Sequence, residues 1–155
     1  MDAQTAGFSD IDALTEMRLA YLSEDSGPLE EKEAGDIRKA LPGYFSAHLG
    51  RDLFAYVVRE YDEIVSCALL LVIEKPMSPA FPNGRTGTVL NVYTRPEHRG
   101  KGCARAVMLQ LMAAAKEKDL SVVELKATQA GVPLYRSVGF TDTGSEYLPM
   151  KWKSF

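Results

Sequence analysis

A glycine-rich segment, Arg99-Gly100-Lys101-Gly102-Cys103-Ala104, constrains the fold of this chain more than any other part. An apolar, strand-like run from Gly87 to Thr94 precedes it, and an amphipathic helical pattern from Gly100 to Lys118 follows. Backbone N–H groups at a helix N-terminus have no intrahelical partner, and the helix dipole adds partial positive charge there. Because glycine also lets the backbone approach an anion closely, the segment predicts a site for a phosphorylated ligand, most simply a pyrophosphate.

The spacing of these glycines excludes two common nucleotide-binding turns. A Walker loop needs lysine followed by serine or threonine after the glycines, and that pair is missing here. A dinucleotide-binding turn needs a third glycine where this chain has Arg105. What remains is the pattern R-x-x-G-x-A from Arg99 to Ala104. This pattern resembles the acyl-CoA-binding signature of the GNAT superfamily, the GCN5-related N-acetyltransferases.

A second motif strengthens that resemblance. Leu134-Tyr135-x-x-x-Gly139-Phe140 looks like the superfamily's second signature, in which a short helix carries a tyrosine and ends at Gly-Phe. The stretch from Asn91 to Arg99 is similar to the family's fourth strand running into the pyrophosphate loop. The motifs occur in the family's order, and the resemblance covers nearly the whole chain from about Ile11.

Composition is typical of one globular domain, residues 1–155, with 46% apolar and 25% charged residues. No apolar run approaches the roughly 20 residues of a membrane span. Met1 to Phe8 lacks the regions of a signal peptide, and Cys67 and Cys103 are too few for a disulfide framework. These features predict a reduced, cytoplasmic setting with no membrane partner.

The distribution of charge and the positions of cysteine and histidine limit the classes of partner that we expect. The net charge is −3 and the basic residues are scattered outside the anion loop, so we expect no nucleic-acid partner. The residues His48 and His98 stand alone, and no Cys/His cluster suggests a metal.

The pattern predicts a mixed α/β (α+β) order of elements. A first helix is expected over Ile11–Leu22, and a second follows Asp36, where Pro42 should kink or restart it. The remaining expected elements are strands at Leu53–Arg59, Ile64–Glu74, Thr86–Thr94 and Ser121–Ala127, a hairpin turn at Tyr61–Glu63, helices at Gly100–Lys118 and Val132–Val138, and a last strand or hairpin within Thr141–Phe155. The long run Ile64–Glu74 is expected to be buried on both faces.

The resemblance implies the GNAT acyl-CoA N-acyltransferase fold, a central, mostly antiparallel sheet splayed between its fourth and fifth strands and flanked by helices. Such proteins usually begin with a strand. Met1 to Phe8 is a poor strand sequence, so we expect that strand to be short or absent.

The resemblance also implies acetyl-CoA or CoA as the cofactor. The backbone of Gly100–Arg105 would hold the pyrophosphate, with Arg99, Lys101 and Arg105 adding charge. The strand edge near Val92 and Thr94 would pair with pantetheine and polarise the thioester. The implied cofactor-binding residues are Val92, Tyr93, Thr94, Arg99, Gly100, Lys101, Gly102, Cys103, Ala104 and Arg105.

The implied reaction is acetyl transfer to a primary amine of a small molecule or peptide by direct attack in a ternary complex. Tyr135 matches the family tyrosine that protonates the departing CoA thiolate. The expected fourth strand carries no carboxylate to act as general base. Asn91 or a water chain is the expected relay, and Glu24 and Glu30 are further candidates.

The connection between the first two helices carries an acidic segment that either attracts a cationic amine or only solubilises a loop. Its acidic residues are Glu24, Asp25, Glu30, Glu31, Glu33 and Asp36. A peptide N-terminus, a polyamine, an aminoglycoside or an amino-acid-like metabolite would each fit.

Two other functions stay open, a non-catalytic acyl-CoA sensor of the same fold and a phosphate-binding protein of another fold. The apolar residues Tyr147, Leu148, Met150 and Trp152 are suited to strand pairing across a homodimer.

Overall fold

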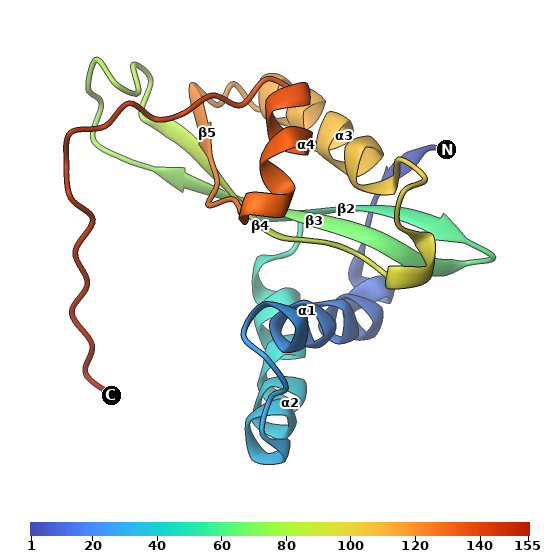
Figure 1. Ribbon diagram of the computed structural model, residues 1–155. Helices are drawn as coiled ribbons and strands as arrows, with labels where there is room; N and C mark the ends of the chain where they lie inside the picture. The colour runs from blue at the N-terminus through green and yellow to red at the C-terminus, as the bar shows by residue number, and fades with distance from the viewer.

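A computed structural model describes residues 1–155 and contains one five-stranded sheet in the order β1-β2-β3-β4-β5 (Figure 1). The strands are β1 Ala3–Thr5, β2 Leu53–Glu60, β3 Glu63–Glu74, β4 Arg85–Thr94 and β5 Val122–Glu124. Neighbouring strands are antiparallel except β4 and β5, which are parallel. The helices are α1 Ile11–Asp25, α2 Glu31–His48, α3 Cys103–Glu117 and α4 Val132–Ser137, with short 3-10 turns η1 Phe8–Asp10, η2 Pro96–His98 and η3 Gln129–Gly131. The expected mixed sheet flanked by helices is confirmed.

Helices cover both faces of the sheet, and each face has its own apolar cluster. Figure 1 shows α3 and α4 on one face and α1 and α2 on the other. The first cluster includes Met108 of α3 against Leu70, and the second includes Met17 of α1 against Cys67. Residues 64–70 of β3 are all buried, because their side chains alternate between the two clusters, but residues 71–73 are only partly buried and Glu74 is exposed, so the predicted burial of Ile64–Glu74 holds only for its first part.

The first strand of the sheet is present but short. Residues Ala3–Thr5 pair antiparallel with Tyr56–Val58 of β2. The hairpin turn between β2 and β3 is also confirmed, with positive φ at Tyr61 (49°) and Asp62 (67°), as a tight two-residue turn requires.

Several predicted boundaries differ from the structure. α3 begins at Cys103 rather than Gly100, because Gly100 and Gly102 have left-handed φ values of 74° and 87° that a helix does not allow. α2 continues through Pro42, so of the expected kink or restart the restart is wrong. β5 has only three residues, shorter than the predicted Ser121–Ala127.

The predicted C-terminal strand is wrong. No regular element follows α4, and the chain beyond Phe140 runs away from the sheet (Figure 1). Trp152 is 85% exposed, and no residue after Phe140 makes a backbone hydrogen bond to another backbone group. A strand needs a partner edge, and neither the short β5 nor any other segment supplies one here. No helix has the length and apolar character needed to cross a membrane.

Candidate active site

A β-bulge interrupts β4 in the middle of the sheet. Cys67 of β3 pairs with Tyr93 and Leu69 pairs with Leu90, so Asn91 and Val92 together oppose a single residue of β3. Asn91 has a φ of +53°, a conformation that asparagine tolerates better than most residues. The bulge therefore bends β4 and redirects its backbone at this point.

Beyond the bulge, one edge of β4 is open. β5 pairs only with Thr86–Thr88, which leaves Val89–Thr94 without a strand partner on that side. The N–H of Arg95 donates to the carbonyl of Val65 in β3 at 2.9 Å. Because successive N–H groups of a strand point to opposite sides, those of Val92 and Thr94 face the open edge. An extended ligand carrying amide groups can pair there.

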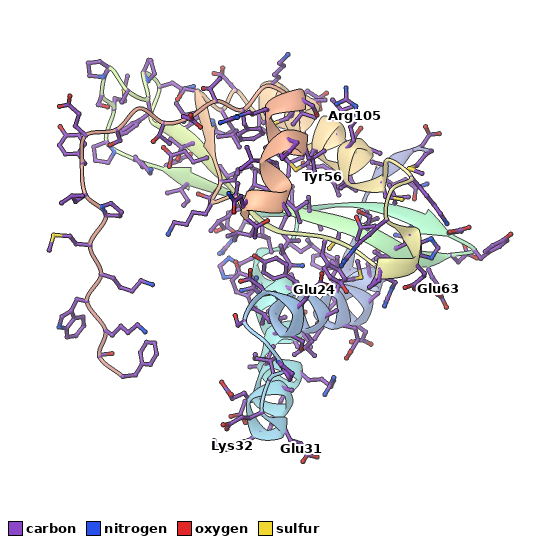
Figure 2. All side chains as sticks on the ribbon, viewed as in Figure 1. Glu24, Glu31, Lys32, Tyr56, Glu63 and Arg105 are labelled. Carbon is purple, nitrogen blue, oxygen red and sulfur yellow. The ribbon has the colours of Figure 1, made fainter.

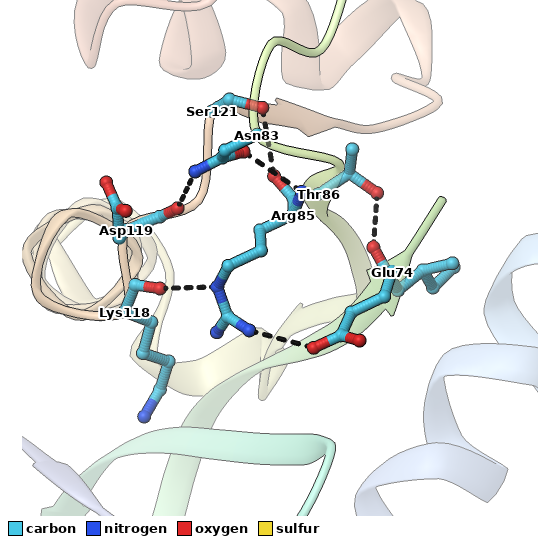
Figure 3. Close-up of polar contacts among 8 residues, drawn as sticks. Glu74, Asn83, Arg85, Thr86, Lys118, Asp119 and Ser121 are labelled. Atoms are coloured by element: carbon cyan, nitrogen blue, oxygen red, sulfur yellow. Dashed lines mark hydrogen bonds and ion pairs between the residues drawn. The ribbon is translucent and has the colours of Figure 1, made fainter. Parts of the chain in front are cut away.

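The other end of the β4–β5 pair is held closed by a polar network (Figure 3). The Arg85 guanidinium donates from Nε to the Lys118 carbonyl at 3.1 Å and from Nη1 to Glu74 Oε1 at 3.0 Å. Ser121 Oγ donates to the Arg85 carbonyl at 3.0 Å. A Cβ at Gly87 would lie 2.7 Å from Leu70 Cδ1, so only glycine fits this packing without a shift. The strands are therefore joined at one end and part at the other.

The open edge leads through η2 into the glycine-rich loop. None of the N–H groups from Gly100 to Arg105 donates a hydrogen bond within the chain. Gly102 is the N-cap of α3, where no side chain caps the helix. A Cβ at Gly100 or Gly102 would meet nothing within 4 Å, so glycine is needed there for its left-handed backbone rather than for space. These free donors lie at a helix N-terminus, which is the geometry that suits an anion.

Two of the three basic side chains expected to serve this loop have partners within the chain. Arg99 Nη2 donates to Glu24 Oε2 at 2.6 Å, and its Nε donates to the Thr94 carbonyl at 2.9 Å. Arg105 Nη1 donates to Ser137 Oγ at 3.0 Å and so links α3 to α4. Lys101 is exposed and makes no ion pair. It remains the cation free to meet a phosphate.

Tyr135 lies on α4, half-buried, with its ring edge-on to that of Phe140 at a centroid distance of 6.1 Å. Gly139 takes a φ of +106° after the helix end, and the Phe140 N–H donates to the Tyr135 carbonyl at 3.0 Å. Burial raises the pKa of the Tyr135 phenol, and the neighbouring Tyr21 raises it further. The hydroxyl is therefore protonated at neutral pH, and it makes no hydrogen bond within the chain.

Asn91 is 4% exposed and points toward α1. Its Oδ1 accepts from Arg18 Nη1 at 3.3 Å, and its Nδ2 lies 3.6 Å from Cys67 Sγ. Burial raises the pKa of the Cys67 thiol to about 12, so that group stays neutral. Both cysteines are free, as expected.

The acidic candidates are not gathered at the bulge. Glu24 pairs with Arg99, which lowers the pKa of its carboxyl and makes it a weaker base. Glu30 precedes α2, and Figure 2 shows the next residue, Glu31, with Lys32 at the end of α2 farthest from the sheet. The structure therefore brings Glu24 to the start of the anion loop and leaves Glu30 remote from it.

Arg18 and Tyr21 of α1 lie beside the candidate residues Asn91 and Tyr135, and sequence reasoning did not single them out. They fall on the first helix, where Ile11, Leu14 and Leu22 recur at helical spacing as a largely apolar stripe. The available signal was an arginine interrupting that stripe, which is an unusual residue for a surface packed on a sheet.

Three features together define the class of protein, an acyltransferase fold that binds acyl-CoA. They are the bulged fourth strand, its open edge beside the fifth strand, and the uncapped glycine loop. A model of the acetyltransferase (GNAT) family matches residues 12–140. The chain therefore belongs to the GNAT family, whose members are acetyl-CoA-dependent N-acetyltransferases.

Similar proteins agree with this assignment. The crystal structure of a predicted acetyltransferase from Clostridium acetobutylicum with acetyl-CoA is 31% identical, with a TM-score of 0.82 over 97% of this chain and 95% of that one. A GCN5-related N-acetyltransferase from Ralstonia eutropha is 26% identical, with a TM-score of 0.75 over 96% and 97%. N-acetyltransferase 8F1 of Rattus norvegicus is 25% identical over 130 residues, which are 81% of this chain but only 57% of that relative.

Proposed function

We propose that this protein transfers the acetyl group of acetyl-CoA to a primary amine by direct attack in a ternary complex. The observation that carries the proposal is the continuous path from the open edge of β4, with the N–H groups of Val92 and Thr94, into the unpaired N–H groups of Gly100–Arg105. Pantetheine amides suit the first part and a pyrophosphate suits the second. The acetyl-CoA bound by the Clostridium acetobutylicum relative supports this choice of donor.

Acetyl-CoA would supply a thioester, and the chain would supply orientation and proton transfer. An N–H of the β4 edge stabilises negative charge on the thioester oxygen as the amine nitrogen attacks the carbonyl carbon. The C–S bond then breaks, and Tyr135 gives its proton to the CoA sulfur. The amine proton leaves through water beside Asn91, since β4 offers no carboxylate.

Much of the rate would come from holding amine and thioester together, because thiolate is already a good leaving group. Loss of the Tyr135 hydroxyl should therefore slow turnover without abolishing it.

A non-catalytic acyl-CoA-binding module is the second candidate function. The observation in its favour is the amide of Asn91 on β4 in place of a carboxylate. Both candidates need the anion loop, but only the enzyme needs Tyr135.

The first experiment is thermal unfolding with acetyl-CoA, CoA, ATP and NAD, followed by acetyl transfer to a panel of amines. A ligand at about 100 times its dissociation constant should stabilise the fold by roughly 2.7 kcal/mol. Stabilisation by both CoA compounds but not by ATP or NAD, with turnover, supports the enzyme. Stabilisation with no turnover on any amine supports the binding module, and no stabilisation contradicts both.

A further inference from the structure

Arg18 is a half-buried cation of α1 beside the bulge, and it has no carboxylate partner. Its Nη1 donates to Oδ1 of Asn91 at 3.3 Å, and its guanidinium carbon lies 5.8 Å from the centre of the Tyr21 ring. Neither partner carries a formal negative charge at neutral pH. Because burying a guanidinium is costly unless an anion compensates it, the chain leaves this charge without its usual counterpart.

Two of the three other half-buried arginines have a carboxylate partner, and the third, Arg95, donates to a backbone carbonyl. Arg59 pairs with Asp10 at 2.8 Å, Arg85 pairs with Glu74 at 3.0 Å, and Arg95 Nε donates to the Ile64 carbonyl at 3.1 Å. The single hydrogen bond of Arg18 is longer than each of these and ends on a neutral amide. Its remaining N–H donors have no acceptor within the chain.

The position of Arg18 is next to the groups assigned to the reaction. Asn91 is the bulge residue, and the residue after it turns its N–H to the open edge of β4. Tyr21 is one helical turn beyond Arg18 on the same face of α1, and it is close enough to Tyr135 to raise the pKa of that phenol. Arg18 therefore contacts the bulge directly and contacts Tyr21, which is a neighbour of Tyr135.

We propose that Arg18 binds an anionic group of the acceptor, so that the preferred substrates are small primary amines carrying a carboxylate or a phosphate. This inference rests on the proposed acetyltransferase function and names its substrate class. A planar guanidinium with free N–H donors matches either anion and binds it by charge-assisted hydrogen bonds. The same charge disfavours a polyamine or aminoglycoside, since a second ammonium group would meet a cation instead of an anion.

The test compares acceptors that differ only in the anion. Free L-alanine, L-methionine and L-phenylalanine are each paired with the corresponding primary carboxamide, and O-phosphoethanolamine is paired with ethanolamine. Acetyl-CoA binding is first measured by calorimetry on the same protein. We expect kcat/KM to favour the anionic member of at least one type of pair by roughly 10-fold or more. The carboxylate and phosphate pairs show which anion the site takes.

The variant Arg18→Gln should bring the ratio of kcat/KM between the anionic and neutral members of the preferred pairs close to one, whatever common change in rate both members share. Arg38→Gln is the matched control. Arg38 lies on α2 and forms an exposed ion pair with Glu16 of α1, so this variant removes the same charge outside the site. An arginine that only holds Asn91 in place would, when replaced, slow both members of each pair equally.

Three results would overturn the inference: no preference for anionic acceptors, an equal loss on both members in Arg18→Gln, or no turnover of any member although acetyl-CoA binds. Absence of acetyl-CoA binding would instead contradict the proposed function on which the inference rests.

Discussion

The two sides of the candidate site are built from different parts of the chain. The proposed donor side consists of the open β4 edge and the glycine loop, where the unpaired backbone N–H groups of Val92, Thr94 and Gly100–Arg105 would be the binding groups. The proposed acceptor side consists of side chains on separate elements, where Arg18 of α1 donates to Asn91 of β4. A backbone site depends on local conformation, whereas a side-chain site depends on how distant segments pack. The donor side should therefore respond mainly to changes in backbone geometry, and the acceptor side to changes in charge.

The largest effect is expected from Gly102→Val. A β-branched residue disfavours the φ of 87° at this position, and its side chain would occupy the open space beside the free N–H groups. We expect acetyl-CoA affinity, measured by calorimetry, to fall by roughly 100-fold or more. Lys101→Ala should weaken binding by only about 3-fold, since Lys101 is an exposed cation. Equal losses in the two variants would show that side-chain charge, not backbone, dominates the donor side.

The closed end of the β4–β5 pair offers a test by packing alone. Gly87→Ala places a Cβ within 2.7 Å of Leu70 Cδ1 and should lower the free energy of unfolding by about 1–3 kcal/mol. Gly43→Ala in α2 is the control, because a Cβ there meets nothing within 4 Å and should raise stability by about 0.5–1 kcal/mol. Urea unfolding measures both. A stable Gly87→Ala variant would mean that this end of the pair is looser than the contacts indicate.

Tyr135→Phe tests the proposed proton donor. Removing the hydroxyl should lower kcat by roughly 10-fold through loss of the proton donor, while the acetyl-CoA dissociation constant stays within about 2-fold. Stopped-flow measurement of acetyl transfer separates chemistry from product release. An unchanged rate of the chemical step would remove Tyr135 from the mechanism.

The ion pair between Glu24 and Arg99 is the direct link between the acceptor-side helix α1 and the anion loop. Arg99 lowers the pKa of Glu24 below its usual 4.5, so the pair stabilises the fold above that pH and this contribution is lost as pH falls through the lowered pKa. Glu24 is about half exposed, which limits the expected loss in Glu24→Gln to about 0.5 kcal/mol at pH 7.

Unfolding free energies of both proteins at pH 7 and pH 3 measure that contribution. The difference between them should nearly vanish at pH 3, where the carboxyl is increasingly protonated. A difference that persists there would point to packing instead of charge.

The smallest effect is expected from truncation after Asp142, outside both sides of the site. Residues 143–155 are exposed and pair with no strand, so their removal should change the melting temperature of the monomer by less than a degree or two. The same truncation tests the predicted homodimer. If Tyr147 to Trp152 pair across two copies, sedimentation will show a dimer only for the full chain, and the melting temperature will then fall on truncation.

Sequence patterns predicted the donor side closely and the acceptor side poorly. The glycine loop, the Tyr135 motif and the strand that precedes the loop lie where the pattern placed them. The partners of the charged residues were not predictable, because Glu24 and Arg99 are far apart in the sequence and only packing joins α1 to the loop. The predicted strand at the C-terminus failed for a related reason, since apolar alternation shows that a segment can pair but not that an edge is available.

The sequence alone determined the order of elements up to α4, the burial of residues 64–70 and the glycine turn before α3, because each depends on neighbouring residues and on the conformations open to glycine. Only the tertiary structure decided that β4 and β5 join at Arg85 and part beyond Thr88, that Glu24 is held by Arg99, and that Arg18 reaches Asn91 across 73 positions of sequence. Those contacts depend on how whole helices pack against the sheet. No local sequence pattern specifies which distant side chain will lie next to a given residue.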